Sequence, residues 1–463
     1  MAVTLPQWNI FIPLFLLRIL SPLFVSTWFV PDEVFQSVEP AHLLVFGSGH
    51  LSWEWSAALR SPLHCIIISL PLYILQFLSL DTPFLVFFIP RLLHSLLFFI
   101  GDLSFYSLCH RLLSTQSSQR IVFILYISNW FLFYCSPRTL ANSLETSLTL
   151  IALCNYPFTQ RECGQKRVTA YLFLATLSII LRPTSALLWI VFGVHHLMIT
   201  PTPLHLIFCR VIPTLLPTLL LSVCLDSWWF GRLTSSLFNF LSFNVLQGGS
   251  AHFGVHPVWW YMTEGLPAVM HLQLIPVVHG LLFYLTLIVN IVMGVYMGAI
   301  HQRGPYAIGE ELKRRTTGEE RVIVLAPCYS IPAYSFFHDK VKEVRGLDCS
   351  PPLNGETHPD EADSFHEDPV KWIEEKKEMI DVFQYAIVYE KTWNVMRESM
   401  EGWNECARVF HGHILEYNCN GTIVEHPEYG EVLQLTGDQR QQVKEFLCKV
   451  GIVKEENCKI HGF

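Results

Sequence analysis

The sequence predicts a mainly α-helical, polytopic membrane protein of roughly eight spans, with a soluble α/β tail. The 463-residue chain is 51% hydrophobic and 15% charged, with a mean hydropathy of +0.36, which is more apolar and less charged than an average soluble protein. Its charge is also divided unevenly. Residues 1–300 hold 12 of the 31 Lys and Arg and 10 of the 39 Asp and Glu, so residues 301–463 are strongly acidic. We therefore expect a membrane domain over 1–300 followed by a separate acidic part.

Eight apolar runs account for the expected spans. A membrane helix needs about 20 apolar residues, and proline is tolerated within such helices. The runs lie at 8–29, 62–80, 83–108, 121–135, 145–156, 169–198, 203–225 and 270–300. Basic loops near 111–120 and 161–167 are expected on the cytoplasmic side. The stretch 121–156 between them must then cross the membrane twice.

The stretch 29–62, here called the acidic loop, follows the first apolar run directly. Carboxylates beside a membrane segment are expensive unless water or a ligand meets them, and tryptophan collects where a membrane meets water. A solvated loop with ordinary surface acids is the alternative, but the crowding of aromatic residues favours a functional site. The candidate residues in this loop are Asp32, Glu33, His42, Trp53, Glu54 and Arg60.

Five of the further charges within or beside the apolar runs are informative. Arg91, Asp102, Arg138 and Glu145 are expected to point into the bundle toward partners on other helices, because an unpaired charge in hydrocarbon is costly. Whether they fix helix packing or contact a substrate stays open. Arg182 lies where a helix meets an interface, where it either extends to water or binds an anion.

A second polar loop, residues 238–267, carries glycines, neutral hydrogen-bonding groups and another aromatic cluster. His252 and His256 could serve as metal ligands, but no third ligand stands at suitable spacing, so hydrogen bonding is the better interpretation. The 13 cysteines include no C-x-x-C pair and hence no zinc or redox motif. Two aromatic, polar loops predict a site at a membrane surface for a lipid-borne, hydroxyl-rich substrate. No basic footprint for nucleic acid is present.

These segments carry a family resemblance. PDEVFQSVEPAHLLVFGSGHLSWEW, followed by RSP, resembles the first luminal loop of the mannosyltransferases of glycosyltransferase family 22, which use dolichyl-phosphate mannose. Further blocks occur in the family's order: SPRTLANSLET (136–146), LRPTS (181–185), FNVLQGGSAHFGVHPVWWY (243–261), HQRG (301–304) and APCYSIPAYSFFH (326–338). They are similar to the branch that adds the third mannose to the GPI-anchor precursor, over about residues 10–410.

The resemblance implies a C-type glycosyltransferase-like bundle in the endoplasmic reticulum membrane, with the soluble part of the transferase at 301–418. Its partners are dolichyl-phosphate mannose, the GPI-anchor precursor and the membrane, with no metal and no cofactor. The family's base falls on Asp32, with Glu33 in reserve. Because the leaving group is a phosphate, one carboxylate suffices as a base, in contrast to the two carboxylates of glycosidases. The substrate-binding residues expected are His42, Trp53, Glu54, Arg60, Arg182, His252 and His256, of which His42, Arg60 and Arg182 are placed near the phosphate.

Two departures from the family pattern stand out. A late membrane motif of the His-Lys-Glu…Arg-Phe type, with about two spans around it, is missing, since Lys166 is the only lysine among the first 300 residues. We therefore expect an impaired transferase. A non-catalytic membrane subunit or inactive isoform is one alternative. A polytopic transporter is another, although no internal repeat typical of transporters is visible.

The second departure is the end of the chain. Residues 419–463 resemble the C-terminal half of translation initiation factor 1, and their pattern predicts strands at 421–425 and 431–435 with a helix at 438–450. Half of a small domain cannot bury a sufficient core. We interpret the segment as a fusion artefact without a function of its own.

Overall fold

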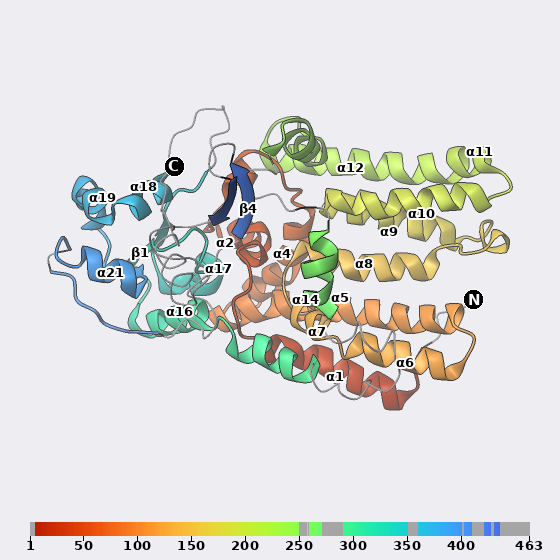
Figure 1. The fold of residues 1–463 in the computed structure, drawn as a ribbon, viewed down its shortest axis with the longest axis horizontal. Helices are drawn as coiled ribbons and strands as arrows, with labels where there is room; N and C mark the ends of the chain where they lie inside the picture. Colours follow the sequence, from red (N-terminus) through yellow and green to blue (C-terminus); the bar gives the residue numbers. More distant parts are fainter. Residues whose placement is uncertain are drawn as a thin grey trace.

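A computed structural model describes residues 5–249, 257, 259–270, 290–350, 360–400, 402–409, 421–426 and 430–435. Long helices run side by side as a bundle, and a smaller α/β domain lies at one end of it (Figure 1). The helices of the bundle region are α1 (Trp8–Phe24), α4 (Leu63–Phe77), α5 (Pro83–Leu112), α6 (Gln116–Ile127), α7 (Trp130–Cys135), α8 (Ala141–Asn155), α9 (Arg167–Leu181), α10 (Ala186–Ile199), α11 (Pro203–Leu206), α12 (Ile212–Phe230), α13 (Ser236–Leu241) and α14 (Leu266–Met270).

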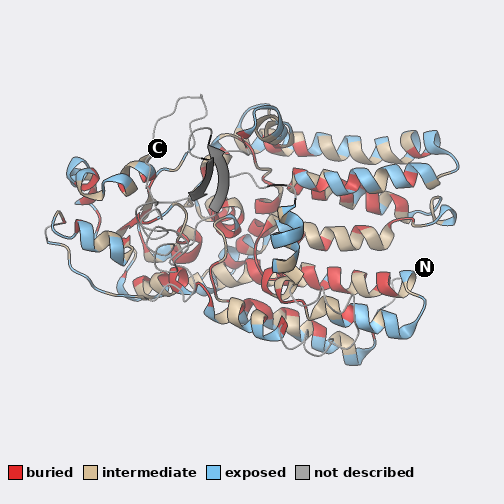
Figure 2. Cartoon of the chain, viewed as in Figure 1, coloured by how far each residue is buried: buried red, intermediate tan, exposed pale blue. Residues whose placement is uncertain are grey.

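The lengths of these helices bear on the predicted span count. Within the described part of the chain, the helices Pro83–Leu112 and Pro203–Phe230 are long and apolar enough to cross a membrane, judged by length and composition. Several shorter helices are also apolar, α1, α4 and α9 among them. The outer surfaces of α10 and α12 are broadly exposed (Figure 2). The mainly helical fold is confirmed, and the number of spans stays a prediction.

The run expected as one span at 169–198 is two helices, so that prediction is wrong. Arg182 takes an extended conformation (φ −147°) before Pro183, because a residue that precedes proline is disfavoured in the α region. The chain reverses there. The indole N–H of Trp189 on α10 donates to the Ser178 hydroxyl on α9, at 2.7 Å. The LRPTS block is therefore the turn of an α9–α10 hairpin.

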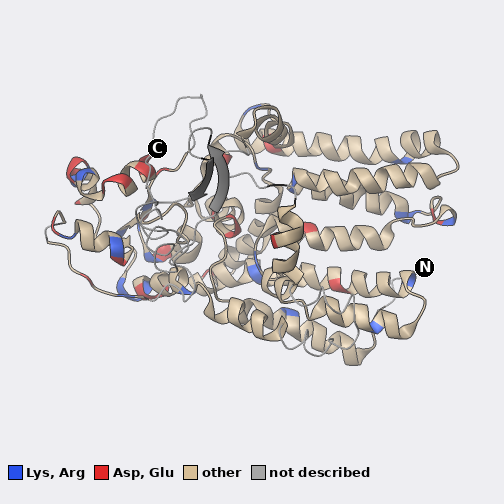
Figure 3. Ribbon diagram, in the orientation of Figure 1, with Lys and Arg blue, Asp and Glu red and all other residues tan. Residues whose placement is uncertain are grey.

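The two basic loops meet at the end of the bundle that lies away from the α/β domain. Arg111 and Arg167, one from each loop, both form ion pairs with Glu162. The helices α6 and α7 lead away from this end and α8 returns to it (Figure 1). Charged residues are otherwise sparse along the bundle (Figure 3). The stretch 121–156 therefore runs along the bundle and back, and its double crossing of a membrane stays a prediction.

The α/β domain contains a parallel sheet in the order β2-β1-β3. Val322 and Val324 of β1 face a core that includes Phe336, whereas Ile323 faces a second core with the α18–α21 helices, as the alternation of side chains along a strand requires. The elements are α16 (Gly304–Arg315), β1 (Arg321–Leu325), α17 (Tyr334–Phe337), β2 (Glu343–Gly346), α18 (Glu361–Glu367), α19 (Pro369–Glu375), α20 (Lys377–Ile380), β3 (Tyr385–Val388) and α21 (Glu390–Met396).

The acidic loop lies between the bundle and the α/β domain. It contains a π-helical turn at Val34–Val38, followed by α2 (Glu39–Phe46) and α3 (Trp53–Ser56). Val34 and Phe35 are buried in the same core as Tyr306 and Phe336 of the α/β domain. The α/β domain is thus packed directly on the acidic loop.

Near the end of the chain, β4 (Gly421–His426) and β5 (Gly430–Leu435) form an antiparallel hairpin in which Gly421 is opposite Leu435. This confirms the two predicted strands. The helix expected at 438–450 lies outside the described residues.

Candidate active site

Glu33 is enclosed by protein and neutralised by two arginines. One carboxylate oxygen accepts from Arg91 and the other from Arg138, each at 2.5 Å, and the side chain is 1% exposed. The Glu33 backbone carbonyl also accepts the Thr139 hydroxyl at 2.6 Å. Burial opposes ionisation, but Arg138 and Arg91 outweigh it and lower the pKa of Glu33. Both oxygens are therefore committed to holding the acidic loop on the bundle, which leaves Glu33 poorly placed for the reserve role as a base.

The other two of the four predicted bundle charges, Asp102 and Glu145, are also paired. Asp102 binds Arg18 of α1 at 2.7 Å, with both side chains buried, and Glu145 binds Arg182 at 2.9 Å. The prediction that the four bundle charges point toward partners elsewhere is confirmed. These partners all lie within the chain as it stands, so the missing segment leaves none of the four unpaired.

Asp32 stands beside Glu33 but is exposed. The amide of Gln36 donates to Asp32, and it also donates to Glu54 at 2.9 Å. Glu54 in turn accepts from Arg60 at 2.7 Å. Desolvation by the surrounding protein raises the pKa of Asp32 above its ordinary value of 3.8, against the lowering effect of Arg60. Because Asp32 keeps open surface and is held by an amide, it is the carboxylate of the pair that a substrate hydroxyl can reach.

Two of the three predicted cations lie at this cluster. Arg60 and Arg182 both act on the charge of Asp32, and their side chains are 22% and 37% exposed. Each is paired with a carboxylate, Glu54 or Glu145, that fixes its position. A guanidinium carries five N–H donors, so each arginine retains donors for an anionic group.

The third predicted cation, His42, lies elsewhere. Its Nδ1 donates to the Ser48 carbonyl at 2.5 Å, and its Nε2 lies 2.9 Å from Nδ1 of His338 in the α/β domain. Burial lowers the pKa of His42 to about 4, so the ring is neutral at physiological pH. This arrangement argues against the phosphate-binding role expected from the sequence and gives His42 a place in the contact between domains.

The second polar loop also reaches the acidic loop. The ring of Trp53 lies against Phe243, with 5.5 Å between ring centroids, and Arg60 lies 6.0 Å from the Phe240 centroid. His252 and His256 lie outside the described residues. Within the described ranges, no three His, Cys, Asp or Glu side chains gather in a way that could hold a metal ion.

Sequence reasoning missed the contribution of the α/β domain. Glu39 is fully buried, and its two carboxylate oxygens accept the backbone N–H groups of His50 (2.9 Å) and Ser335 (2.7 Å). Burial raises the pKa of Glu39. The Gln36 amide that joins Asp32 to Glu54 was also missed. The sequence signal for this contribution was the APCYSIPAYSFFH block, which is unusually rich in aromatic and polar residues and includes Ser335.

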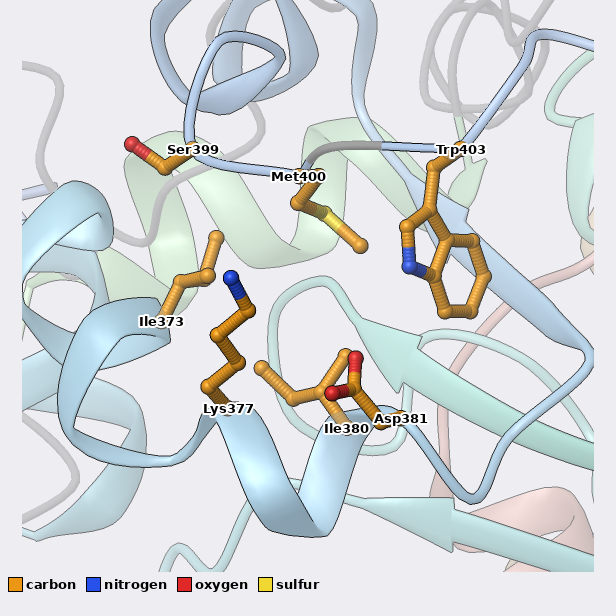
Figure 4. A pocket seen from close by; sticks show the side chains of 7 residues that line it. All are labelled: Ile373, Lys377, Ile380, Asp381, Ser399, Met400 and Trp403. Atoms are coloured by element: carbon orange, nitrogen blue, oxygen red, sulfur yellow. The ribbon is translucent and has the colours of Figure 1, made fainter.

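A shallow pocket with a cavity volume of about 10 Å³, room for about one water molecule, lies on the α/β domain, between the α19–α20 region and the turn that follows α21 (Figure 4). It is smaller than a typical ligand site of about 300–1,000 Å³. Its lining residues are Ile373, Lys377, Ile380, Asp381, Ser399, Met400 and Trp403. None of the predicted site residues is among them, so the acidic loop remains the candidate site.

Sequence comparison establishes that this helical protein is a glycosyltransferase. The model of the Alg9-like mannosyltransferase family matches residues 9–286 and 272–338, and the chain belongs to this family. A second model, translation initiation factor SUI1, matches residues 415–453, which supports the resemblance of the C-terminal segment.

Curated relatives are similar over most of their length. The GPI alpha-1,2-mannosyltransferase 3 of Homo sapiens is 33% identical in an alignment of 431 positions that covers 79% of this chain and 77% of the relative. The protein of the same name from Danio rerio is 29% identical, covering 92% and 90%. The GPI mannosyltransferase 3 of Drosophila melanogaster is 31% identical, covering 79% and 76%. No solved structure matches the chain.

The alignment to the human relative also bears on the missing segment. Its 431 positions exceed 79% of the 463 residues of this chain, so the relative carries residues inside the aligned region that this chain lacks. The two stretches matched by the family model meet and overlap at 272–286. The expected loss of an internal piece is supported.

Proposed function

We propose that this protein transfers mannose from dolichyl-phosphate mannose to a mannose hydroxyl of the GPI-anchor precursor, adding the third mannose. The proposal rests on the different environments of the two neighbouring carboxylates, Asp32 and Glu33. Glu33 has both oxygens bound to buried arginines, whereas Asp32 is exposed beside Arg60 and Arg182. An accessible base next to accessible cations suits the attack of a hydroxyl on a phosphate-activated sugar.

In the proposed reaction, Asp32 accepts the proton of the attacking hydroxyl while the bond from the anomeric carbon to the phosphate breaks. The displacement is single and therefore inverting. Arg60 and Arg182 stabilise the negative charge on the departing phosphate. The lipid phosphate leaves as an anion, so no general acid, cofactor or metal is needed for this step. Glu54 holds Arg60 and, through Gln36, restrains Asp32.

We propose that the acceptor sugar binds beside Trp53 and Phe243. Their rings form an apolar surface next to the hydrogen-bonding groups of Glu54 and Arg60. A sugar presents both C–H faces and hydroxyl groups, and this combination of ring surface and polar side chains matches both. The substrate-binding roles of Trp53, Glu54 and Arg60 are retained in this proposal.

The site is proposed to face the lumen of the endoplasmic reticulum, with roughly eight spans in a multi-pass arrangement. The basic loops joined through Glu162 lie at the opposite end of the bundle, as expected for a cytoplasmic end. The α/β domain on the site side carries the disulfide Cys328–Cys349, and disulfides persist in oxidising compartments such as this lumen. Two independent features therefore favour the same orientation.

Complementation tests the function. Cells that lack the third GPI mannosyltransferase are transfected with this chain, with its Asp32→Asn variant and with a full-length relative, and surface GPI-anchored protein is measured by flow cytometry. Restoration above the Asp32→Asn level supports the proposal. Equal signals from the chain and from Asp32→Asn, with rescue by the relative, would favour the alternative of an inactive isoform or non-catalytic subunit, which the missing internal residues keep open.

A further inference from the structure

We infer that Tyr329 is a positioning residue for the acceptor side of the site, and that the Cys328–Cys349 disulfide holds it there. The inference rests on the proposed function, because it assigns Trp53 and Glu54 to the acceptor. It concerns the segment 328–349, here called the docking loop, which belongs to the α/β domain and not to the acidic loop.

Tyr329 has an uncommon backbone conformation and a central place. Its φ is +56°, in the left-handed region that few non-glycine residues adopt and that costs free energy wherever it is kept. Its ring lies 4.8 Å from that of Phe35 and 5.9 Å from that of His50, measured between centroids. The backbone N–H of Trp53 donates to its hydroxyl. One side chain therefore contacts the π-helical turn, the segment before α3 and the first residue of α3.

The hydroxyl of Tyr329 acts as the cap of α3. The first N–H groups of a helix have no partner within the helix and need one from outside. The residue before α3, Ser52, provides no side-chain cap, and its buried hydroxyl has no hydrogen-bond partner. The Tyr329 hydroxyl accepts the N–H of Trp53, the first residue of α3. The α/β domain therefore fixes the start of the short helix that carries both Trp53 and Glu54.

The disulfide closes the segment from which the other polar contacts to the acidic loop also come. Cys328 and Cys349 are 21 residues apart in sequence, and Cys328 directly precedes Tyr329. Between them lie Ser335, which binds Glu39, and His338, which faces His42. Closing a loop restricts its conformational freedom. The disulfide therefore limits the movement of the docking loop and helps keep Tyr329 in its left-handed conformation.

The test compares three changes in the full chain, in the microsomal membrane: Tyr329→Phe, the double variant C328A/C349A, and Tyr385→Phe as the matched control. Tyr385 packs against the same core from β3. Tyr329→Phe keeps the ring and removes only the hydroxyl. Hydrogen exchange of the Trp53 amide is measured first, because it needs no activity, and loss of one hydrogen bond is expected to speed it about 5- to 10-fold. The double variant should speed exchange at both Trp53 and His50.

Kinetics then separate positioning from general destabilisation. In Tyr329→Phe the KM for the acceptor should rise about 5- to 10-fold, while the KM for the donor stays at its wild-type value. Equal loss of both, with less folded protein, would indicate a structural role and overturn the inference. Unchanged exchange at Trp53 in both variants would overturn it as well. If the unaltered chain shows no transfer, the proposed function fails while the exchange experiment still decides whether Tyr329 caps α3.

Discussion

Replacing Glu33 by Gln should destabilise the protein strongly, whereas replacing Asp32 by Asn should abolish transfer without destabilising it. Glu33 is 1% exposed, and its carboxylate meets Arg91 and Arg138 at 2.5 Å. Removing one member of a buried ion pair costs about 3–5 kcal/mol, because the remaining charge is left uncompensated. Here two guanidinium groups lose their counterion. Even the lower value lowers the ratio of folded to unfolded protein about 150-fold.

The chain contains a matched control for this experiment. Glu162 also joins two arginines, Arg111 and Arg167, but it lies at the opposite end of the bundle and its side chain is 19% exposed. Ion pairs open to solvent contribute about 0–1 kcal/mol, so Glu162→Gln should shift the unfolding midpoint only slightly. The contrast between the two variants therefore measures burial and not the mere presence of two arginine partners.

The assay is thermal unfolding in detergent, followed by tryptophan fluorescence, together with the amount of protein in the membrane and the rate of mannosyl transfer. Glu33→Gln is expected to lower both the midpoint and the amount. Asp32→Asn is expected to leave the unfolding midpoint and the amount of protein in the membrane unchanged and to abolish mannosyl transfer. A Glu33→Gln protein with a wild-type midpoint and no transfer would assign the base to Glu33, and the division of labour proposed for the two carboxylates would be wrong.

Four further predictions concern the site and the tail. Arg60→Gln and Arg182→Gln should raise the KM for the donor about tenfold each, as loss of a charged hydrogen bond implies, which steady-state kinetics with a fixed acceptor will measure. Transfer should decline as the pH falls through the raised pKa of Asp32, so the acidic limb of the pH–rate profile lies above pH 3.8. A raised carboxyl pKa also means that the folded protein disfavours the ionised form of Asp32. The Asp32→Asn variant should therefore unfold at the same temperature as the unaltered protein or at a higher one. Deleting residues 419–463 should leave transfer unchanged, and a cooperative melt of that segment alone would contradict its assignment as a fragment. The chain as it stands should restore little surface GPI-anchored protein compared with a full-length relative.

Much of the candidate site could be predicted because local sequence carries its signal. Acids beside an apolar run are costly in any fold, so Asp32 and Glu33 were identifiable without a structure. Their different environments were not identifiable, because the partners of Glu33 lie 58 and 105 residues away along the chain. The same applies to His42, whose neutral state depends on burial against His338, 296 residues away.

Fold-level prediction failed at turns and at distant contacts. The run 169–198 is apolar almost throughout, and only the short LRPTS block, with Arg182 and Pro183, indicates that a helix ends there. For the region that holds the parallel sheet at 321–388, the sequence predicted an α/β fold but not the individual strands. These strands are short, and their pairing is set by the packing of helices on both faces of the sheet. The Cys328–Cys349 disulfide was missed because its cysteines are 21 residues apart, and the pairing of distant cysteines is set by the fold and not by local sequence.

The missing internal segment should impair the donor side of the site more than the folding of the bundle. The residues that follow the missing segment pack against the chain just after α1. The backbone N–H of Ser26 donates to the Gly298 carbonyl at 2.8 Å, and that of Trp28 donates to the Gln302 carbonyl at 2.9 Å. These contacts place the HQRG block beside the acidic loop and close the bundle there. The Glu33 ion pairs are also complete. What the chain lacks is the Lys, Glu and Arg of the late motif implied by the family resemblance, and cations are the groups that a phosphate-linked donor requires. A weak transferase with an intact acidic loop and a poor affinity for its donor is the expected consequence.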